Sequence, residues 1–279
     1  MSVDEVVEAG AVLADGAGRP GRATALVTAL ATTPVKGLRL LAREELLLEP
    51  AGVAGNRSFY LVDDRARLVN GKLVGILAAV RADYDAVGGR LTMTFPGGSV
   101  VSGAISLGEE IETRFFSRRP VARLVSGPWS DALSEFAGRR LRMVRADPVL
   151  GGVDRGRAGA VSLISTASVA RLEGLADGRG IDARRFRMLV EVTGPAAHEE
   201  DLWVGGNVRI GGALVAMRGH VGRCLVTTQS PDTGVVDLPT LDLLSYRRGL
   251  RTTEPLAFGV YGEIVEPGLV KLGDPVVAV

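Results

Sequence analysis

The stretch RGHVGRCLVTTQSPDTG, residues 218–234, holds the one cysteine of the chain, Cys224. Arg218 and Arg223 place positive charge on both sides of it. Such a setting favours the thiolate, which is the form that acts as a nucleophile and as a metal ligand. We therefore expect the chain to be organised around a loop that presents Cys224.

The residues around Cys224 predict the shape of this loop. Gly219 and Gly222 suit a backbone that bends sharply or approaches a ligand closely. The β-branched run LVTT at 225–228 predicts a strand, and SPDTG at 230–234 predicts a turn. A lone cysteine is also commonly a small buried hydrophobe, so that interpretation stays open beside the functional one.

Composition excludes several classes of protein. The 279 residues carry a formal net charge of +1 with both signs mixed, and no basic tract or aromatic-interleaved basic patch predicts nucleic-acid binding. A single cysteine excludes an intrachain disulfide framework and all-cysteine zinc or iron-sulfur sites. The acidic N-terminus lacks the pattern of a signal peptide, and no apolar run reaches the roughly 20 residues that a membrane span needs. We expect a cytoplasmic protein that binds no membrane.

Short runs of alternating valine and leucine, separated by glycine, proline or aspartate, predict many strands and tight turns. The first strand is expected at residues 25–32, with hairpin turns at Asp63-Asp64 and Gly88-Gly89. No helical periodicity of useful length occurs before residue 128. The first half is therefore expected to be an antiparallel barrel or sandwich.

Three helices are expected in the second half. Ser130 begins one that stops at Gly138, Ser165 or Thr166 caps the next, and Thr240 caps the third. Strands lie between them, so the fold class is α+β and strand-dominated. We divide the chain into a leader or weakly ordered segment (1–24), an N-terminal β-barrel-like module (25–126) and a second β-barrel domain with a few short helices (127–279).

Several strings in this order resemble the MOSC family, named after the C-terminal domain of molybdenum cofactor sulfurase. The N-terminal module is matched by PVKG at 34–37 and PAGVAGNRSF at 50–59. The second half is matched by LISTAS, RFR, EEDLWVGG, the Cys224 loop, FGVY and the terminal VKLGDPV. Each string is weak alone, but together they cover nearly the whole chain.

The resemblance implies a molybdenum cofactor (molybdopterin) and an oxidoreductase similar to the amidoxime-reducing component group. Cys224 would be the metal ligand and a catalytic residue. His220, four residues before Cys224 in the sequence, is a candidate proton donor or a group that supports the site indirectly. Phosphate and pterin would be held by a set of cationic and hydroxyl side chains: Lys36, Arg57, Ser165, Thr166, Arg185, Arg187 and Arg223. The substrate would be an N-hydroxylated or other oxygen-bearing small molecule. A separate reductase would donate the electrons, because the chain lacks cysteines for an iron-sulfur centre.

Each of these residues also has an ordinary structural interpretation. Lys36 and Arg57 are interpreted equally well as ordinary solvated charges. Arg185 and Arg187 lie two apart on an expected strand, hence on one face, as in an ion-paired surface strand. Ser165 and Thr166 also suit a simple helix cap. A loop histidine such as His220 is commonly just exposed to water.

Some positions depart from the cofactor-binding pattern of the family. Gly37 stands where a serine is common, Asn70-Gly71-Lys72 replaces a Thr-Arg-Gln-like string, and Met188-Leu189 replaces Pro-Asn. Val221 stands where many relatives have a second cysteine. Two alternatives therefore stay open beside the molybdoenzyme. One is a molybdenum-free enzyme acting on a small molecule, by sulfur transfer through Cys224 or by acid/base chemistry. The other is a non-catalytic carrier of cofactor or sulfur.

Overall fold

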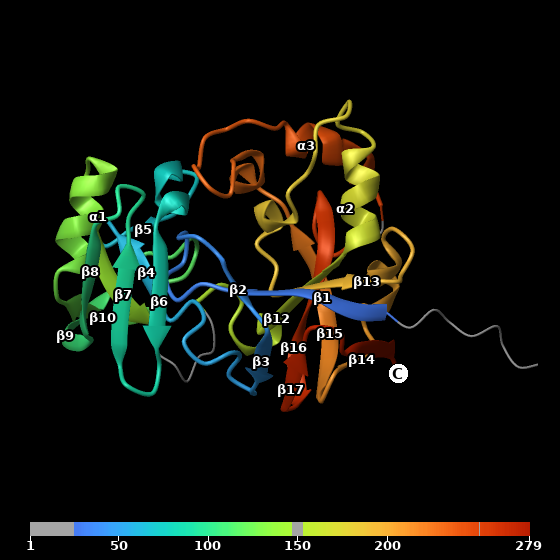
Figure 1. The fold of residues 1–279 in the computed structure, drawn as a ribbon, viewed down its shortest axis with the longest axis horizontal. Helices are drawn as coiled ribbons and strands as arrows, with labels where there is room; N and C mark the ends of the chain where they lie inside the picture. The colour runs from blue at the N-terminus through green and yellow to red at the C-terminus, as the bar shows by residue number, and fades with distance from the viewer. Residues whose placement is uncertain (1–24, 147–152, 251) are drawn as a thin grey trace, which may run out of the picture.

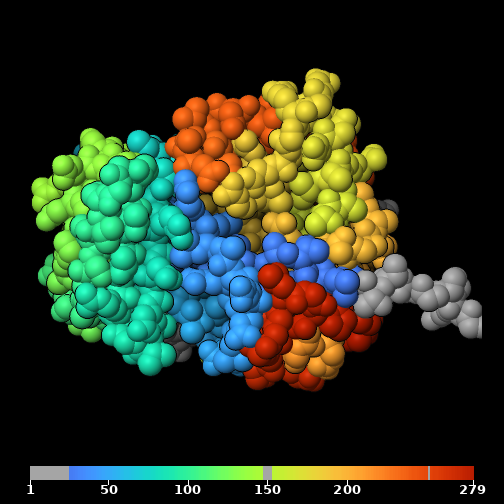
Figure 2. Space-filling view, in the orientation of Figure 1, coloured from blue at the N-terminus to red at the C-terminus, as the bar shows by residue number. Residues whose placement is uncertain are grey.

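The computed structural model describes residues 25–146, 153–250 and 252–279. Two strand-rich modules lie side by side (Figure 1). Figure 2 shows the first of the described residues, in blue, lying at the junction between them. The strand-dominated α+β class predicted from the sequence is confirmed, and the predicted leader at 1–24 lies outside the described residues.

The first module combines two antiparallel sheets with one helix. Within the described residues, the sheets have the strand orders β5-β4-β11-β10-β9 and β6-β7-β8. The strands are β4 (Phe59–Val62), β5 (Leu68–Val69), β6 (Arg81–Asp85), β7 (Arg90–Thr94), β8 (Val100–Ala104), β9 (Ser106–Glu112), β10 (Val121–Ser126) and β11 (Arg142–Ala146). Phe59, Leu91 and Met93 from these sheets share one buried core with Trp129 of α1 (Trp129–Ala137).

The second module is a closed barrel. In the part of the chain that is described, seven strands close it in the order β13-β12-β16-β15-β14-β18-β1, and β1 pairs back with β13. β2 extends the sheet beyond β1. The strands are β1 (Ala25–Thr32), β2 (Leu41–Arg43), β12 (Val161–Ser165), β13 (Val190–Thr193), β14 (Asn207–Ile210), β15 (Ala213–Gly222), β16 (Ala257–Glu266) and β18 (Pro275–Ala278). β12 and β13 run parallel, and the other neighbours run antiparallel.

The two modules exchange elements across the predicted boundary at 126/127. β1 lies in the barrel because Val27 and Leu30 face its core, where Leu30 pairs with Val190. α1 and β11 follow residue 126, yet β11 pairs with β4 and β10 of the first module. β3 (Glu45–Leu48) likewise pairs with β17 (Gly268–Lys271). The strand pairing therefore does not follow the sequence division, because strands from each side of residue 126/127 pair with strands of the other module.

The predicted helices form with altered ends. α1 stops at Gly138, whose left-handed backbone (φ +62°) closes the helix as expected. α2 (Thr166–Glu173) is capped by the Ser165 side chain and ends at Gly174. α3 (Thr240–Leu243) is a single turn that continues as a 3-10 helix, Leu244–Arg247. In the described ranges, no helix is both long and apolar enough to cross a membrane.

Candidate functional site

Cys224 lies two residues after the end of β15, at the edge of a cavity between the two modules. β15 pairs with β16 through several register irregularities, the last of them between His220 and Gly222. The backbone of Gly222 lies so close to Glu254 that a Cβ there would come within 2.9 Å of its carboxylate. After this closely packed turn, Cys224 lines the cavity with a free, half-buried thiol.

The strand predicted after Cys224 is wrong: residues Leu225–Thr228 form a 3-10 helix. The amide and hydroxyl of Thr227 both donate to the Cys224 carbonyl at 3.0 Å, and the Thr228 hydroxyl donates to Leu225 at 2.7 Å. These local bonds compete with strand pairing. The predicted turn at 230–234 is confirmed, since the Gly234 amide donates to the Ser230 carbonyl at 2.8 Å.

The cavity has a volume of about 460 Å³ and draws its walls from both modules. Cationic side chains line much of it, and apolar groups such as Phe116, Met188 and Val221 line the rest. The predicted site residues that border this cysteine cavity are Lys36, Arg57, Arg185, Arg187, Arg223 and Cys224. Residues far apart in the sequence are thus brought to one place, as the family resemblance implies.

Lys36 and Arg57 form a cradle on the first-module side. The Lys36 amide donates to Phe59 at 2.8 Å and the Arg57 amide donates to Thr33 at 2.7 Å, which fixes both residues on neighbouring backbone segments. Their side chains converge on Asp154: Lys36 Nζ donates to one carboxylate oxygen and Arg57 Nη1 to the other. Sequence reasoning missed Asp154, since nothing in its local sequence links it to residues about a hundred positions earlier.

The electrostatics of the cradle are dominated by burial and positive charge. Burial lowers the pKa of Lys36, with Arg57 acting in the same direction and Asp154 against it. Burial opposes ionisation of Asp154, but Lys36 and Arg57 outweigh it and hold the pKa of that carboxyl below its ordinary value. Burial also lowers the pKa of Arg187 to about 10. The guanidinium of Arg187 donates to the Leu38 carbonyl at 2.7 Å and has no acidic ion-pair partner among the described residues.

Two further cations of the cavity also lack an acidic partner within the described part of the chain. Arg155 stacks over the Tyr261 ring at 4.5 Å from its centroid, and Lys72 is exposed at the rim. Asp154 is the one acidic residue among the described lining residues. The cysteine cavity therefore carries an excess of positive charge that suits an anionic ligand.

Arg223 and Arg185 serve the protein framework as well as bordering the cavity. Arg223 donates to the carbonyls of Phe258 (2.8 Å) and Phe186 (2.7 Å), and its burial lowers its pKa to about 9. Arg185 makes a two-pronged ion pair with Asp237 at 2.7 and 2.8 Å. It lies on a 3-10 helix, Ala183–Phe186, so the strand expected for Arg185 and Arg187 is wrong. These bonds fix the segments that flank Cys224.

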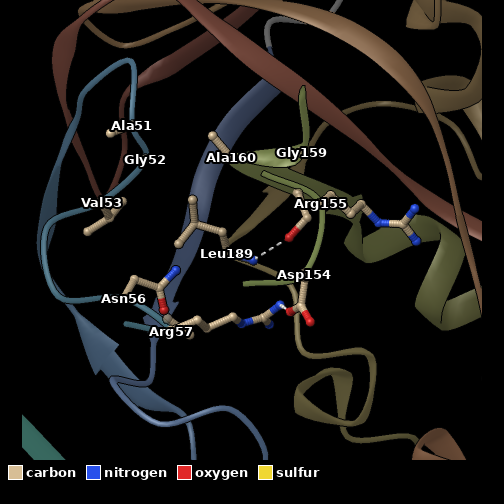
Figure 3. A pocket seen from close by; sticks show the side chains of 12 residues that line it. Ala51, Gly52, Val53, Asn56, Arg57, Asp154, Arg155, Gly159, Ala160 and Leu189 are labelled. Carbon is tan, nitrogen blue, oxygen red and sulfur yellow. Dashed lines mark hydrogen bonds and ion pairs between the residues drawn. The ribbon is translucent and has the colours of Figure 1, made fainter. Parts of the chain in front are cut away.

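The positions that depart from the family pattern have different surroundings. Gly37 and residues 70–72 line the cysteine cavity. The Leu189 side chain instead packs in the barrel core and borders a smaller hollow of about 40 Å³ beside the cavity (Figure 3). Its amide donates to the Ser162 hydroxyl at 3.1 Å. Ser162, which borders both spaces, is a second residue that sequence reasoning missed.

Ser165, Thr166 and His220 do not line the cysteine cavity. Ser165 and Ser168 donate to the buried carboxyl group of Glu200, so the N-terminus of α2 is already occupied by a group of the chain. His220 is buried, and its Nε2 lies 3.7 Å from Asp201. We name this second group of polar residues the histidine network; it consists of Ser165, Ser168, His198, Glu200, Asp201, His220, Tyr246, Arg247 and Thr253.

Arg218 also lies away from the cavity, where its exposed guanidinium pairs with Glu263 at 2.9 Å. It therefore does not flank the thiol as its sequence position suggested. Among the residues that the structure describes, no three His, Cys, Asp or Glu side chains gather into a metal-binding group.

Comparison with known families identifies two domains. Residues 24–123 match the MOSC N-terminal beta barrel domain, and residues 149–277 match the MOSC domain. Together these matches span most of the chain. The second lies over the barrel that carries Cys224, and the first contains Lys36 and Arg57.

Curated relatives match over part of the chain. Mitochondrial amidoxime reducing component 2 of Bos taurus is 36% identical over 42% of this chain and 36% of its own length. Mitochondrial amidoxime-reducing component 1 of Homo sapiens is 34% identical over 41% of this chain and 35% of its own. The matched part thus spans little more than a third of these relatives. Among solved structures, the YUAD protein of Bacillus subtilis aligns over 91% of this chain and 94% of its own, with a TM-score of 0.45 and 14% identity.

Proposed function

The chain belongs to the MOSC family, and we propose that it is a molybdenum cofactor-binding oxidoreductase that reduces an N-hydroxylated or other oxygen-bearing small molecule. One observation carries the proposal: the free thiol of Cys224 borders the same cavity as the cationic cradle of Lys36 and Arg57. A thiolate ligand and a phosphate-binding group are the two attachments that such a cofactor needs.

The residues present fit the cofactor by their donor chemistry. The Cys224 thiolate would bind molybdenum, which accepts soft sulfur ligands. Lys36, Arg57 and Arg187 would hold the pterin phosphate, because their positive charge exceeds what Asp154 neutralises. When bound, the cofactor supplies the two-electron chemistry of oxygen-atom removal.

The chain's own residues position the ligand and the thiol. Arg223, the residue before Cys224, donates from its guanidinium to the carbonyls of Phe186 and Phe258. These bonds hold the backbone at Cys224 in place. Removing oxygen from an N-hydroxylated compound consumes two electrons and two protons and releases water. We propose that a separate reductase supplies the electrons, since a single cysteine cannot build an iron-sulfur centre.

A second candidate function has its own support. Lys36 and Arg57 already donate to Asp154. With Gly37 and Asn70–Lys72 in its wall, the cavity also has fewer polar side chains for a cofactor than the family pattern provides. A molybdenum-free enzyme would use Cys224 as a nucleophile or persulfide carrier on an anionic substrate. A non-catalytic carrier of cofactor or sulfur would need the same cavity. The predicted acid/base role of His220 has no support from its place in the histidine network. The cytoplasmic location stays a prediction.

The test is elemental analysis of the full chain expressed in a host that makes molybdenum cofactor. We expect molybdenum and pterin close to one per chain in the wild type and loss of molybdenum in Cys224→Ser, with the fold unchanged because serine is nearly isosteric. Arg218→Met is the matched control, since this exposed arginine lies outside the cavity. Full metal in Cys224→Ser would overturn the ligand assignment, and a wild type without metal or pterin would favour the second candidate.

Turnover separates the enzyme from the carrier. With molybdenum bound, an artificial electron donor and an N-hydroxylated substrate should give reduced product. A molybdenum-loaded protein with no turnover on any such substrate would be a carrier.

A further inference from the structure

We propose that Asp154 determines which anions the cradle binds. Its carboxylate occupies the position between Lys36 and Arg57, so that the cradle admits a phosphate dianion and rejects singly charged anions. The inference rests on the proposed function in taking the cofactor's phosphate as the natural occupant of the cradle.

The contacts show that Asp154 uses the cradle as a bound anion would. One carboxylate oxygen accepts from Lys36 Nζ and the other from Arg57 Nη1. Neither cation has another acidic partner among the described residues. In Figure 3 the Arg57 and Asp154 side chains point toward one another beside the small hollow. The anion position between Lys36 and Arg57 is therefore occupied by a carboxylate of the chain itself.

Charge explains why this internal anion is replaceable. A carboxylate brings one negative charge and two acceptor oxygens, and Arg187 remains without an acidic partner in the described part of the cavity. A phosphate dianion brings two negative charges and three acceptor oxygens, enough for Lys36, Arg57 and Arg187 together. The displaced Asp154 carboxylate can turn to water, since about a quarter of its side chain is already exposed (24%).

The tether explains why a singly charged anion fails. Asp154 is held beside the cradle by the chain, at an effective concentration on the order of millimolar or more. A free carboxylate offers the same charge and the same two oxygens. A free carboxylate must also lose translational freedom on binding, so it cannot displace the Asp154 carboxylate from Lys36 and Arg57. The cradle thus selects for charge number without any additional contact.

Anion binding by the full chain, purified from a host that makes no molybdenum cofactor, tests this inference. Inorganic phosphate at pH 8 and acetate are titrated at constant ionic strength by calorimetry into the wild type and Asp154→Asn. We expect the wild type to bind phosphate and not acetate. Asp154→Asn should bind phosphate about tenfold more tightly and should bind acetate measurably, because the tethered competitor is gone. The matched control Asp83→Asn removes an exposed partner of Arg43 outside the cavity and should leave both titrations unchanged.

A purely structural ion pair predicts a different result. In that case Asp154→Asn would be less stable than the wild type, but its affinity for phosphate and its preference for phosphate over acetate would be unchanged. This result would overturn the inference. Asp154→Ser repeats the test with a smaller side chain, and failure of both variants to fold would likewise make Asp154 a structural link. If anion selectivity changes as expected but the wild type retains no molybdenum, this inference stands and the cofactor proposal falls.

Discussion

The cysteine cavity and the histidine network both place charged side chains against the same barrel, but they balance charge differently. In the histidine network, Asp201 is paired with Arg247 and lies near His220, and Glu200 accepts from two serines. Among the described residues that line the cysteine cavity, one carboxylate faces several cations. The comparison teaches that unbalanced charge around a cavity marks a ligand site, whereas internally paired charge marks a structural element.

Breaking the pair in the histidine network should produce the largest loss of stability. Arg247 is buried, and it donates to Asp201 and to the Ala257 carbonyl. Arg247→Met leaves Asp201 without its cation, which should lower the free energy of unfolding by about 3 kcal/mol. Urea denaturation of the wild type and the variant measures this difference in the free energy of unfolding.

The control for this prediction is Arg218→Met, which removes an exposed pair with Glu263 and should cost less than about 1 kcal/mol. Phosphate affinity of the metal-free protein should stay unchanged in both variants. A large fall of phosphate affinity in Arg247→Met at full stability would mean that the two regions are not separate.

The histidine network should also make stability depend on pH. Both histidines of the chain belong to it. Burial, aided by the charge of Arg247, lowers the pKa of His198 from 6.5 to about 4. Below pH 6.5 the unfolded chain therefore binds a proton that the folded chain does not, so stability present above pH 6.5 is lost as pH falls toward 4. A fall of the pKa from 6.5 to about 4 corresponds to about 3 kcal/mol, and the partial solvent exposure of His198 reduces the expected loss to about 2 kcal/mol.

The measurement compares the pH dependence of unfolding in the wild type and His198→Asn. Asparagine suits the left-handed backbone at this position (φ +67°) and does not titrate here. The difference between the two proteins isolates His198 from Glu200, whose pKa is raised by burial and which acts in the opposite direction. Parallel pH profiles for the two proteins would show that His198 is not held neutral.

Sequence reasoning succeeded where local pattern decides the structure. The alternation at residues 25–32 gave β1, and Gly138 gave the end of α1. It also gathered Lys36, Arg57 and Cys224, which share one cavity, because the resemblance carried long-range information that no local pattern holds.

It failed where hydrogen bonds from distant or local partners decide. The threonines after Cys224 bond back to the backbone and form a 3-10 helix in place of a strand. Ser165 resembles a phosphate-binding helix start, yet Glu200, 35 residues later, supplies the carboxyl group to which the Ser165 hydroxyl donates. Asp154 carries no local sign of its two partners. A sequence shows which residues are charged, but the balance of those charges is a property of the fold.

The smallest expected change in stability distinguishes two arginines that the sequence placed together. Arg187→Met removes a half-buried cation without an acidic ion-pair partner among the described residues, so relief of its repulsion with Arg57 should offset the lost bond to Leu38. The free energy of unfolding should change by less than about 1 kcal/mol. Phosphate affinity of the metal-free protein should fall about tenfold, because one of three cations facing the phosphate is lost.

Arg185→Met is the matched control and should behave in the opposite way. Arg185 is paired with Asp237 and donates to Gln229, so its loss should destabilise the fold while phosphate affinity stays near that of the wild type. Calorimetry and urea denaturation on both variants give the four values. If Arg187→Met destabilised the fold as Arg185→Met does and left phosphate binding intact, Arg187 would belong with the internally paired charges, and unbalanced charge would no longer mark the site.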